Sequence, residues 1–217
     1  MSINLILIGP PGVGKGTQAS LVVERLGLVH LASGDIFRNE ISNETELGLW
    51  AQSFIERGEL VPDEITIGMM DARISADDVS RSGFVLDGFP RTVAQAVALD
   101  ELLGRLGVIV DRVISLEVED DDVVERISGR RLCPNCGELY HVTNKPPKID
   151  EACDVCDTKL VVREDDNPDT IRQRLEVFHK TTQPVIEHYA SSGALFRVQG
   201  IGSIEEVYAA MTEGFSQ

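Results

Sequence analysis

Short apolar runs alternate along this chain with longer segments in which apolar residues recur every three or four positions. Five short runs, at residues 4–8, 29–32, 84–86, 113–118 and 195–198, predict β-strands. Regular alternation of strands and amphipathic helices is typical of a parallel sheet that helices cover on both faces. We therefore expect an α/β fold with a doubly wound, five-stranded parallel sheet.

The intervening segments carry helical spacing, as at Ala19, Val22, Val23 and Leu26 in the first of them. We expect three helices within residues 34–76 and one each at 92–106, 120–128, 168–190 and 203–214. Pro62 fits the first turn of one of these helices, with Asp63 and Glu64 beside its positive end.

The segment 131–166 has a different character, because it holds all four cysteines, three of the nine prolines and little apolar periodicity. This composition indicates an insertion with a small core of its own.

Composition narrows the class of protein. The chain has 217 residues, 42% of them apolar and 26% charged, which is enough for one domain with an insertion. No stretch approaches the roughly 20 apolar residues of a membrane span. The first apolar run breaks at Gly9, without a basic region before it, so we expect a cytoplasmic protein rather than a secreted one.

The net charge of −16 argues against a broad basic face for nucleic acid, so an anionic ligand must meet a local basic pocket. The 20 cationic residues are 15 arginines and 5 lysines. This bias fits bidentate recognition of phosphate, and a bias of genome composition explains it equally well. We expect no nucleic-acid or membrane partner, and a monomer.

A glycine-rich segment follows the first predicted strand and opens the next helix: Gly9-Pro-Pro-Gly12-Val13-Gly14-Lys15-Gly16-Thr17. Such glycines let backbone N–H groups converge on phosphate oxygens, while the helix N-terminus and Lys15 add positive charge. The alternative is an ordinary glycine-rich turn. Gly16 stands where the strict motif has Ser or Thr, so direct ligation of Mg²⁺ by a hydroxyl is lost at that place.

The four cysteines form two CxxC pairs, Cys133 with Cys136 and Cys153 with Cys156, and 16 residues separate the pairs. This spacing predicts a tetrahedral thiolate site, with zinc as the default ion and iron or cobalt as alternatives. Disulfides are the competing interpretation, which a reducing cytosol disfavours. His141 could replace one ligand, although packing or nucleotide contact suits it better. Four thiolates close the coordination sphere, so the metal would be structural.

Four further motifs follow the glycine-rich segment in order along the chain. Gly-x-Pro-Gly-x-Gly-Lys-Gly-Thr is followed by Ser33-Gly34-Asp35, by Leu86-Asp87-Gly88-Phe89-Pro90-Arg91-Thr92, by Gly129-Arg130-Arg131 and by Arg163, Arg172 and Arg174. From about residue 4 to about residue 200 the chain thereby resembles the adenylate kinases of the long-lid, zinc-binding type. The resemblance implies Mg²⁺-dependent, reversible transfer of the terminal phosphate of ATP to AMP, giving two ADP. A kinase of the same fold acting on another nucleoside monophosphate is the alternative.

The resemblance also implies a division of the chain and of the site. The core P-loop kinase domain would comprise 1–32, 62–128 and 167–217, with an AMP-binding insertion at 33–61 and a metal-binding lid at 129–166. The expected ATP-binding residues are Gly12, Val13, Gly14, Lys15, Gly16, Thr17, Arg126, Arg130, Leu139, Tyr140 and Gly202. The expected AMP-binding residues are Ser33, Gly34, Arg38, Glu59, Leu60, Val61, Gly88, Phe89, Pro90, Arg91, Gln95, Arg163 and Arg174. The expected catalytic residues are Lys15, Arg91, Arg130, Arg163 and Arg174, and Asp87 would hold Mg²⁺, through water.

Elementary chemistry agrees with this assignment. Phosphoryl transfer spreads negative charge over equatorial oxygens, so arginines converging from several elements would suit it. The acceptor phosphate is already anionic near neutral pH, which removes the need for a general base. Arg131 and Arg172 are expected either to be solvated or to pair with acids such as Asp165 and Asp166.

A different class of function, a zinc ribbon that binds nucleic acid with the P-loop as a switch, is opposed by the acidic charge. Glu151, Asp154 and Asp157 stand within the proposed ribbon itself.

Overall fold

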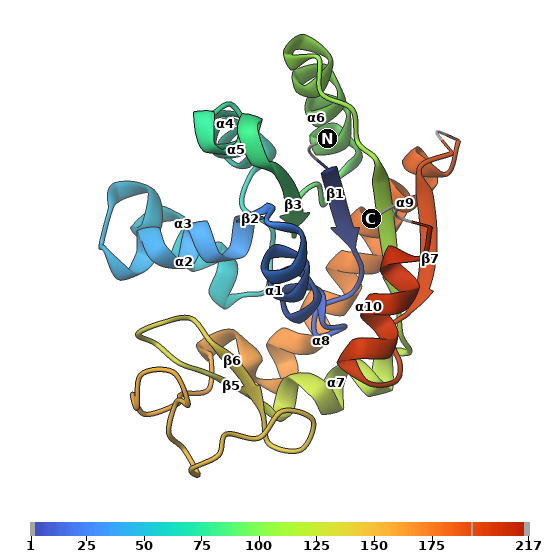
Figure 1. The fold of residues 1–217 in the computed structure, drawn as a ribbon. Helices are drawn as coiled ribbons and strands as arrows, with labels where there is room; N and C mark the ends of the chain where they lie inside the picture. Colours follow the sequence, from blue (N-terminus) through green and yellow to red (C-terminus); the bar gives the residue numbers. More distant parts are fainter. Residues whose placement is uncertain (1–2, 192, 215–217) are drawn as a thin grey trace.

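The computed structural model describes residues 3–191 and 193–214, and a five-stranded parallel sheet forms its centre (Figure 1). The strands are β1 (Ile3–Ile8), β2 (Val29–Ala32), β3 (Gly83–Asp87), β4 (Arg112–Glu117) and β7 (Leu195–Gln199). Their order is β2-β3-β1-β4-β7, and every neighbouring pair is parallel. The predicted doubly wound, five-stranded sheet is confirmed.

Helices bury both faces of this sheet, which explains why its strands are apolar runs without alternation. Leu5 and Leu7 of β1 pack with α1 (Lys15–Leu26) and α10 (Ile204–Thr212). The intervening residues Ile6 and Ile8 face the opposite layer. That layer consists of α4 (Asp63–Ile74), α5 (Asp77–Ser82), α6 (Val93–Leu106) and α9 (Gln183–Ala190).

Two helices, α2 (Ser33–Ser42) and α3 (Glu46–Glu56), extend from one side of the sheet (Figure 1). They pack closely, because a Cβ on Gly48 would lie only 2.2 Å from the carbonyl oxygen of Glu40. With α4 they are the three helices predicted for residues 34–76. Pro62 is the residue before α4 rather than part of its first turn, and the short helix α5 was not predicted.

The cysteine-containing segment forms a separate small unit after α7 (Asp120–Ser128). Its two strands, β5 (Arg130–Leu132) and β6 (Leu139–His141), pair antiparallel, and a 3₁₀ turn, η1 (Glu164–Asp166), ends the segment. Cys133, Tyr140, Cys153 and Leu160 are its buried core. The expected insertion with a core of its own is therefore present.

The long helix predicted at 168–190 is unbroken along the chain but irregular in the middle. It comprises α8 (Pro168–Val177), a π-helical stretch η2 (Phe178–Thr182) and α9. Single π turns inside helices are frequent at functional sites. Here the turn brings the Thr182 hydroxyl to 2.9 Å from the carbonyl oxygen of Arg91, to which it donates.

Among the residues that the structure describes, no helix has both the length and the apolar character needed to cross a bilayer.

Candidate active site

A long cleft of about 1040 Å³ runs past the carboxyl ends of the central strands. It is lined by the glycine-rich loop, Asp87, the segment 200–205 and residues of β6. A smaller side pocket of about 70 Å³ joins it and shares Gly34, Arg38, Gly88, Arg91 and Arg174 with it. Ligands of open α/β sheets bind at this edge, so the cleft can hold an elongated molecule with a group at each end.

The glycine-rich loop between β1 and α1 has the geometry of a phosphate cradle. Gly12 and Gly14 have φ values of 74° and 103°, in the left-handed region that favours glycine. Lys15 folds back over the loop, and its Nζ donates to the carbonyl oxygens of Gly9 and Pro10 at 2.7 and 2.8 Å. Burial, opposed by Asp87 and assisted by neighbouring arginines, lowers the pKa of Lys15 to about 8. An anionic ligand in the cradle would stabilise the ammonium form.

Asp87 ends β3 beside this loop. A Cβ on Gly16 would lie 3.6 Å from its Oδ2, and the Nε2 of His30 lies 3.7 Å from the same oxygen. Burial alone would raise the pKa of Asp87, but His30, Lys15 and Arg91 outweigh burial and hold that pKa below its usual range. The carboxylate is therefore ionised near neutral pH and offers the hard oxygen ligands that Mg²⁺ prefers.

Arg130 and Arg174 are held by two acids that the 3₁₀ turn η1 supplies. The Nε of Arg130 donates to Asp166 Oδ2 at 2.8 Å, and its Nη2 donates to Asp166 Oδ1. Arg174 Nη1 donates to Asp165 Oδ2 at 2.8 Å. Both arginines also line the cleft, so the acids fix the positions of cations that face a ligand.

The suggested pairing of Arg131 and Arg172 with these acids is therefore wrong. Arg172 is exposed and pairs with Asp169 at 2.9 Å, as the solvated alternative predicted. Arg131 donates to the carbonyl oxygens of Ser128 and Arg130. Sequence order could not assign the partners, because Asp166 meets an arginine 36 residues away.

Three further arginines line the cleft, and two of them, Arg91 and Arg163, form no ion pair within the described residues. Arg91 donates to the Gly88 carbonyl oxygen at 2.7 Å, and burial together with the charge of Arg174 lowers its pKa to about 10. Within the described residues Arg163 has no ion pair, and its buried Nε has no hydrogen-bond partner. Burial and the charges of Arg38 and Arg130 lower the pKa of Arg163 to about 10. Arg38 pairs with Asp35. The centre of the cleft thus has positive charge that the protein does not neutralise.

The side pocket combines apolar walls with one amide. Phe37, Ile55 and Val61 line it, together with the backbone stretch at Glu59 and Leu60 that the sequence indicated. Gln95, which the resemblance assigned to the AMP site, lies on its wall with only 1% of its surface exposed. Ser33 also lines the pocket and donates to the Gly88 carbonyl oxygen at 2.6 Å.

Phe89 is buried after β3 and, unlike its neighbours Gly88 and Pro90, lines neither cavity. It packs in the sheet core, from which it supports the turn that carries Arg91.

At the other end of the cleft, two side chains hold the loop that follows β7. Arg126 donates to the Gly200 carbonyl oxygen at 2.7 Å, and Gln18 donates to that of Ile204 at 3.0 Å. Gly202, with φ 110°, lies between these points and lines the cleft. Sequence reasoning missed Gln18, and the only available signal was its place one turn after Lys15 on α1.

Leu139 and Tyr140 reach the cleft from β6. A Cβ on Gly16 would lie 3.5 Å from Leu139 Cδ1, so this strand lies against the phosphate cradle. Tyr140 is 4% exposed, and its hydroxyl accepts a hydrogen bond from the backbone of Asp154 at 2.7 Å. Most of the Tyr140 ring therefore serves the core of the cysteine segment.

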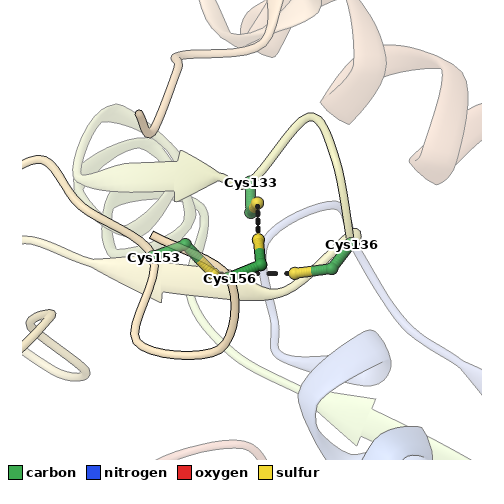
Figure 2. A group of neighbouring side chains, drawn as sticks. All are labelled: Cys133, Cys136, Cys153 and Cys156. Carbon is green, nitrogen blue, oxygen red and sulfur yellow. Dashed lines mark hydrogen bonds between the residues drawn. The ribbon is translucent and has the colours of Figure 1, made fainter. Parts of the chain in front are cut away.

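The four cysteines converge as predicted, from the β5–β6 turn and from a later loop (Figure 2). Their Sγ atoms all lie within 4.8 Å of one another, with Cys133 and Cys156 at 3.4 Å and Cys136 and Cys153 at 3.5 Å. Tetrahedral coordination with metal–sulfur bonds of about 2.3 Å separates sulfurs by about 3.8 Å. The residues fit a bound metal ion after small shifts of the side chains, and none of the four forms a disulfide.

His141 does not belong to the group of ligand atoms that converge within the described part of the chain, and its Nδ1 accepts from the backbone of Thr143 at 3.1 Å. Its ring lies over Gly129, where an added Cβ would come within 2.3 Å of Nε2. The packing role expected for His141 matches this arrangement.

The chain is similar to known proteins over most of its length. A family profile described as adenylate kinase matches residues 7–194. The chain is 49% identical over 207 residues to the adenylate kinase of Acidothermus cellulolyticus, covering 95% of both chains. It is 50% identical over 211 residues to that of Bacillus licheniformis, covering 97% of both. The adenylate kinase of Carboxydothermus hydrogenoformans is 47% identical over 209 residues, covering 96% of this chain and 97% of its own.

Proposed function

Because this chain belongs to the adenylate kinase family and is a phosphotransferase that reversibly transfers the terminal phosphate of ATP to AMP, giving two ADP, we propose how its own residues perform that reaction. ATP occupies the long cleft with its phosphates in the glycine-rich loop, and AMP occupies the side pocket. The observation that carries the proposal is that Lys15 and six arginines line one cavity in a chain of net charge −16. These arginines are Arg38, Arg91, Arg126, Arg130, Arg163 and Arg174.

For the donor, the backbone N–H groups of residues 12–17 bind phosphate oxygens at the positive end of α1. Lys15 turns from its two carbonyl partners toward the outer phosphates. The base extends toward Gly202, where Arg126 holds the loop backbone. Leu139 and Tyr140 cover the nucleotide from the segment 129–166.

For the acceptor, Arg38 and Arg91 bind the phosphate, and the base enters the apolar side pocket. Val61 and Phe37 supply its walls, and the Gln95 amide meets the polar edge of the base. Ser33, Gly34, Glu59, Leu60, Gly88 and Pro90 shape the pocket around it.

In the transfer step, an oxygen of the AMP phosphate forms a new bond to the γ-phosphorus of ATP. The bond between that phosphorus and the β–γ bridging oxygen breaks, and ADP leaves with the electron pair. Arg130, Arg163 and Arg174 bind the equatorial oxygens, where charge is greatest in the transition state. These cations are positioned before the reaction, because Asp165 and Asp166 already hold two of them. No proton needs to be removed from the acceptor.

The donor set at Asp87 fits Mg²⁺ held through water, because the carboxylate is ionised and stands beside the cradle. Bound Mg²⁺ would neutralise part of the charge on the phosphate chain. Gly16 offers no hydroxyl beside it, and we assign the protein's contribution to the metal to Asp87.

In the cysteine segment we propose zinc as the ion, since four thiolates and a closed tetrahedral shell are its usual structural site. The ion would substitute for a larger hydrophobic core. The segment 129–166 then moves as one rigid lid, residues 33–61 act as the AMP-binding insertion, and the rest is the core. Closure of the lid excludes water that would hydrolyse ATP.

One chain contributes every group of the site, so we propose that the monomer is active. Reduced thiolate ligands are typical of a reducing compartment, which supports the cytoplasm as the place of action.

The two-site assignment can be tested with one variant at each end of the cleft. Arg126→Ala should raise the KM for ATP and leave that for AMP nearly unchanged, whereas Arg38→Ala should do the reverse. Arg81→Ala, at an arginine with 79% of its side chain exposed, is the matched control and should change neither value. If the two variants exchange effects, or both change only one KM, the assignment is wrong.

A further inference from the structure

The amide of Gln95 in the side pocket is fixed at both ends. Its Oε1 accepts a hydrogen bond from the backbone N–H of Arg91 at 2.8 Å, and its Nε2 donates to Asp63 Oδ1 at 2.7 Å. The other carboxylate oxygen of Asp63 accepts from the Thr92 hydroxyl at 2.9 Å, and that hydroxyl caps α6 by accepting from the Gln95 backbone at 3.1 Å. Asp63 therefore joins the start of α4 to the start of α6 across the pocket wall.

These partners determine which end of the amide is oxygen and which is nitrogen. A backbone N–H can only donate, and an ionised carboxylate can only accept. A rotation of the amide by 180° would place two donors together at Arg91 and two acceptors together at Asp63. Because Gln95 is 1% exposed, water could not satisfy the mismatched groups. The amide thus presents a single pattern to the pocket.

We propose that Asp63 is a positioning residue that makes this pocket select a 6-aminopurine over a 6-oxopurine as the acceptor base. The inference rests on the proposed placement of AMP in the side pocket and deepens it.

The selection follows from the pattern of donors and acceptors on the two kinds of base. Adenine presents an N–H donor at its 6-amino group beside an acceptor ring nitrogen, and an oriented glutamine amide pairs with both. A 6-oxopurine presents an oxygen acceptor and a protonated ring nitrogen, which is the reverse pattern. With the amide held by Asp63, a 6-oxopurine would place its oxygen against the amide oxygen and its ring N–H against the amide N–H. Buried polar groups would then remain unpaired. Without Asp63 only the Arg91 N–H still orients the amide, so rotation costs less and the pocket discriminates less between the two bases.

A positioning role for Asp63 and a purely structural role for it predict different results. Asp63 also places negative charge in the first turn of α4, where it stabilises the helix. Loss of that contribution would affect turnover of all acceptors alike, whereas release of the Gln95 amide changes the ratio between acceptors. The ratio of kcat/KM for AMP to kcat/KM for inosine monophosphate is therefore the decisive quantity, since these nucleotides differ only at the 6-position and the adjacent ring proton.

The experiment compares Asp63→Ala with the wild-type protein under saturating Mg·ATP. We expect the AMP to inosine monophosphate ratio to fall about tenfold, the effect of one hydrogen bond to a charged group, with the KM for ATP unchanged. Asp63→Asn retains an oxygen acceptor and should give an intermediate ratio. Glu64→Ala removes a neighbouring exposed carboxylate of the same helical turn and should leave the ratio unchanged. A wild-type ratio in Asp63→Ala overturns the proposal, and if that variant does not fold, a wild-type ratio in Asp63→Asn does so.

A separate variant distinguishes this inference from the proposed function. Gln95→Ala should raise the KM for AMP severalfold and leave the KM for ATP unchanged. If it does not, the placement of AMP itself is wrong. If it does, but the Asp63 variants keep the wild-type ratio, only the role of Asp63 fails.

Discussion

The guanidinium of Arg130 meets both carboxylate oxygens of Asp166, and the Asp166 side chain is wholly buried beneath it. Arg174 approaches the same carboxylate at 3.6 Å while binding Asp165. Bidentate pairs of this kind fix orientation as well as charge. The acids of η1 therefore set the positions of the arginines that face the transferred phosphate.

Asp166→Ala should lower both the free energy of unfolding and kcat. Removing one member of a buried pair leaves the cations uncompensated, at a cost of about 3–5 kcal/mol. Urea denaturation and steady-state kinetics would measure the two effects. The exposed pair of Arg172 and Asp169 provides the control, since Asp169→Ala should change stability by less than about 0.5 kcal/mol. Equal effects of the two variants would contradict the positioning role.

Arg163→Met should reduce kcat by about a hundredfold or more without reducing the melting temperature. Burial opposes the charge of Arg163, and no ion pair within the described residues compensates it, so the apolar side chain relieves an unfavourable interaction. Calorimetry and a coupled assay give the two readouts. A variant that melts at lower temperature and keeps its activity would reverse both parts of this expectation.

Lys15→Ala should reduce turnover by about a hundredfold or more while the fold is retained, because a charge that faces phosphate is lost and the core is not disturbed. Circular dichroism should be unchanged. Lys180→Ala, at an exposed lysine that does not line the cleft, is the matched control and should keep wild-type turnover. Nearly full activity in Lys15→Ala would show that the donor phosphates bind elsewhere.

The pH dependence of the free enzyme should also report on Lys15. Its pKa of about 8 in the folded protein lies below the ordinary lysine pKa of 10.5. Between these two pH values the unfolded chain binds more protons than the folded one, so Lys15 makes the free energy of unfolding rise with pH. Over the same interval ATP affinity should fall, since the ammonium is lost. Denaturation and binding measured at pH 7 and pH 9.5 test this, and in Lys15→Met this part of both changes should disappear.

Cys153→Ala should release the bound metal and lower the melting temperature by several degrees, with catalysis retained at low temperature. Elemental analysis and thermal melting would show the loss. Val155→Ala, at a 68% exposed position of the same loop, is the control and should keep both metal and stability. Inactivation of Cys153→Ala with the metal retained and the melting temperature unchanged would argue against a structural metal.

Local features of the sequence predicted the strands, the glycine-rich loop and the thiolate site. The five strands are contiguous apolar runs, and their parallel arrangement follows from the helices between them. The glycine-rich loop lies within nine consecutive residues, and each CxxC pair brings two thiolates together over a single turn. In all of these features the interacting groups are near one another in the chain, so spacing alone predicts their geometry.

The tertiary structure decided the relationships between distant residues. It paired Arg130 with Asp166 rather than Arg131 or Arg172 with the same acids, and it inserted a π turn in a helix that apolar spacing describes as regular. It also brought Asp63, which the sequence marked only as a helix-terminal charge, to the amide of a glutamine 32 residues away. Such contacts depend on how separate elements pack against one sheet. The sequence by itself therefore determined which chemical groups this protein has, and only packing decided which of them hold one another in place.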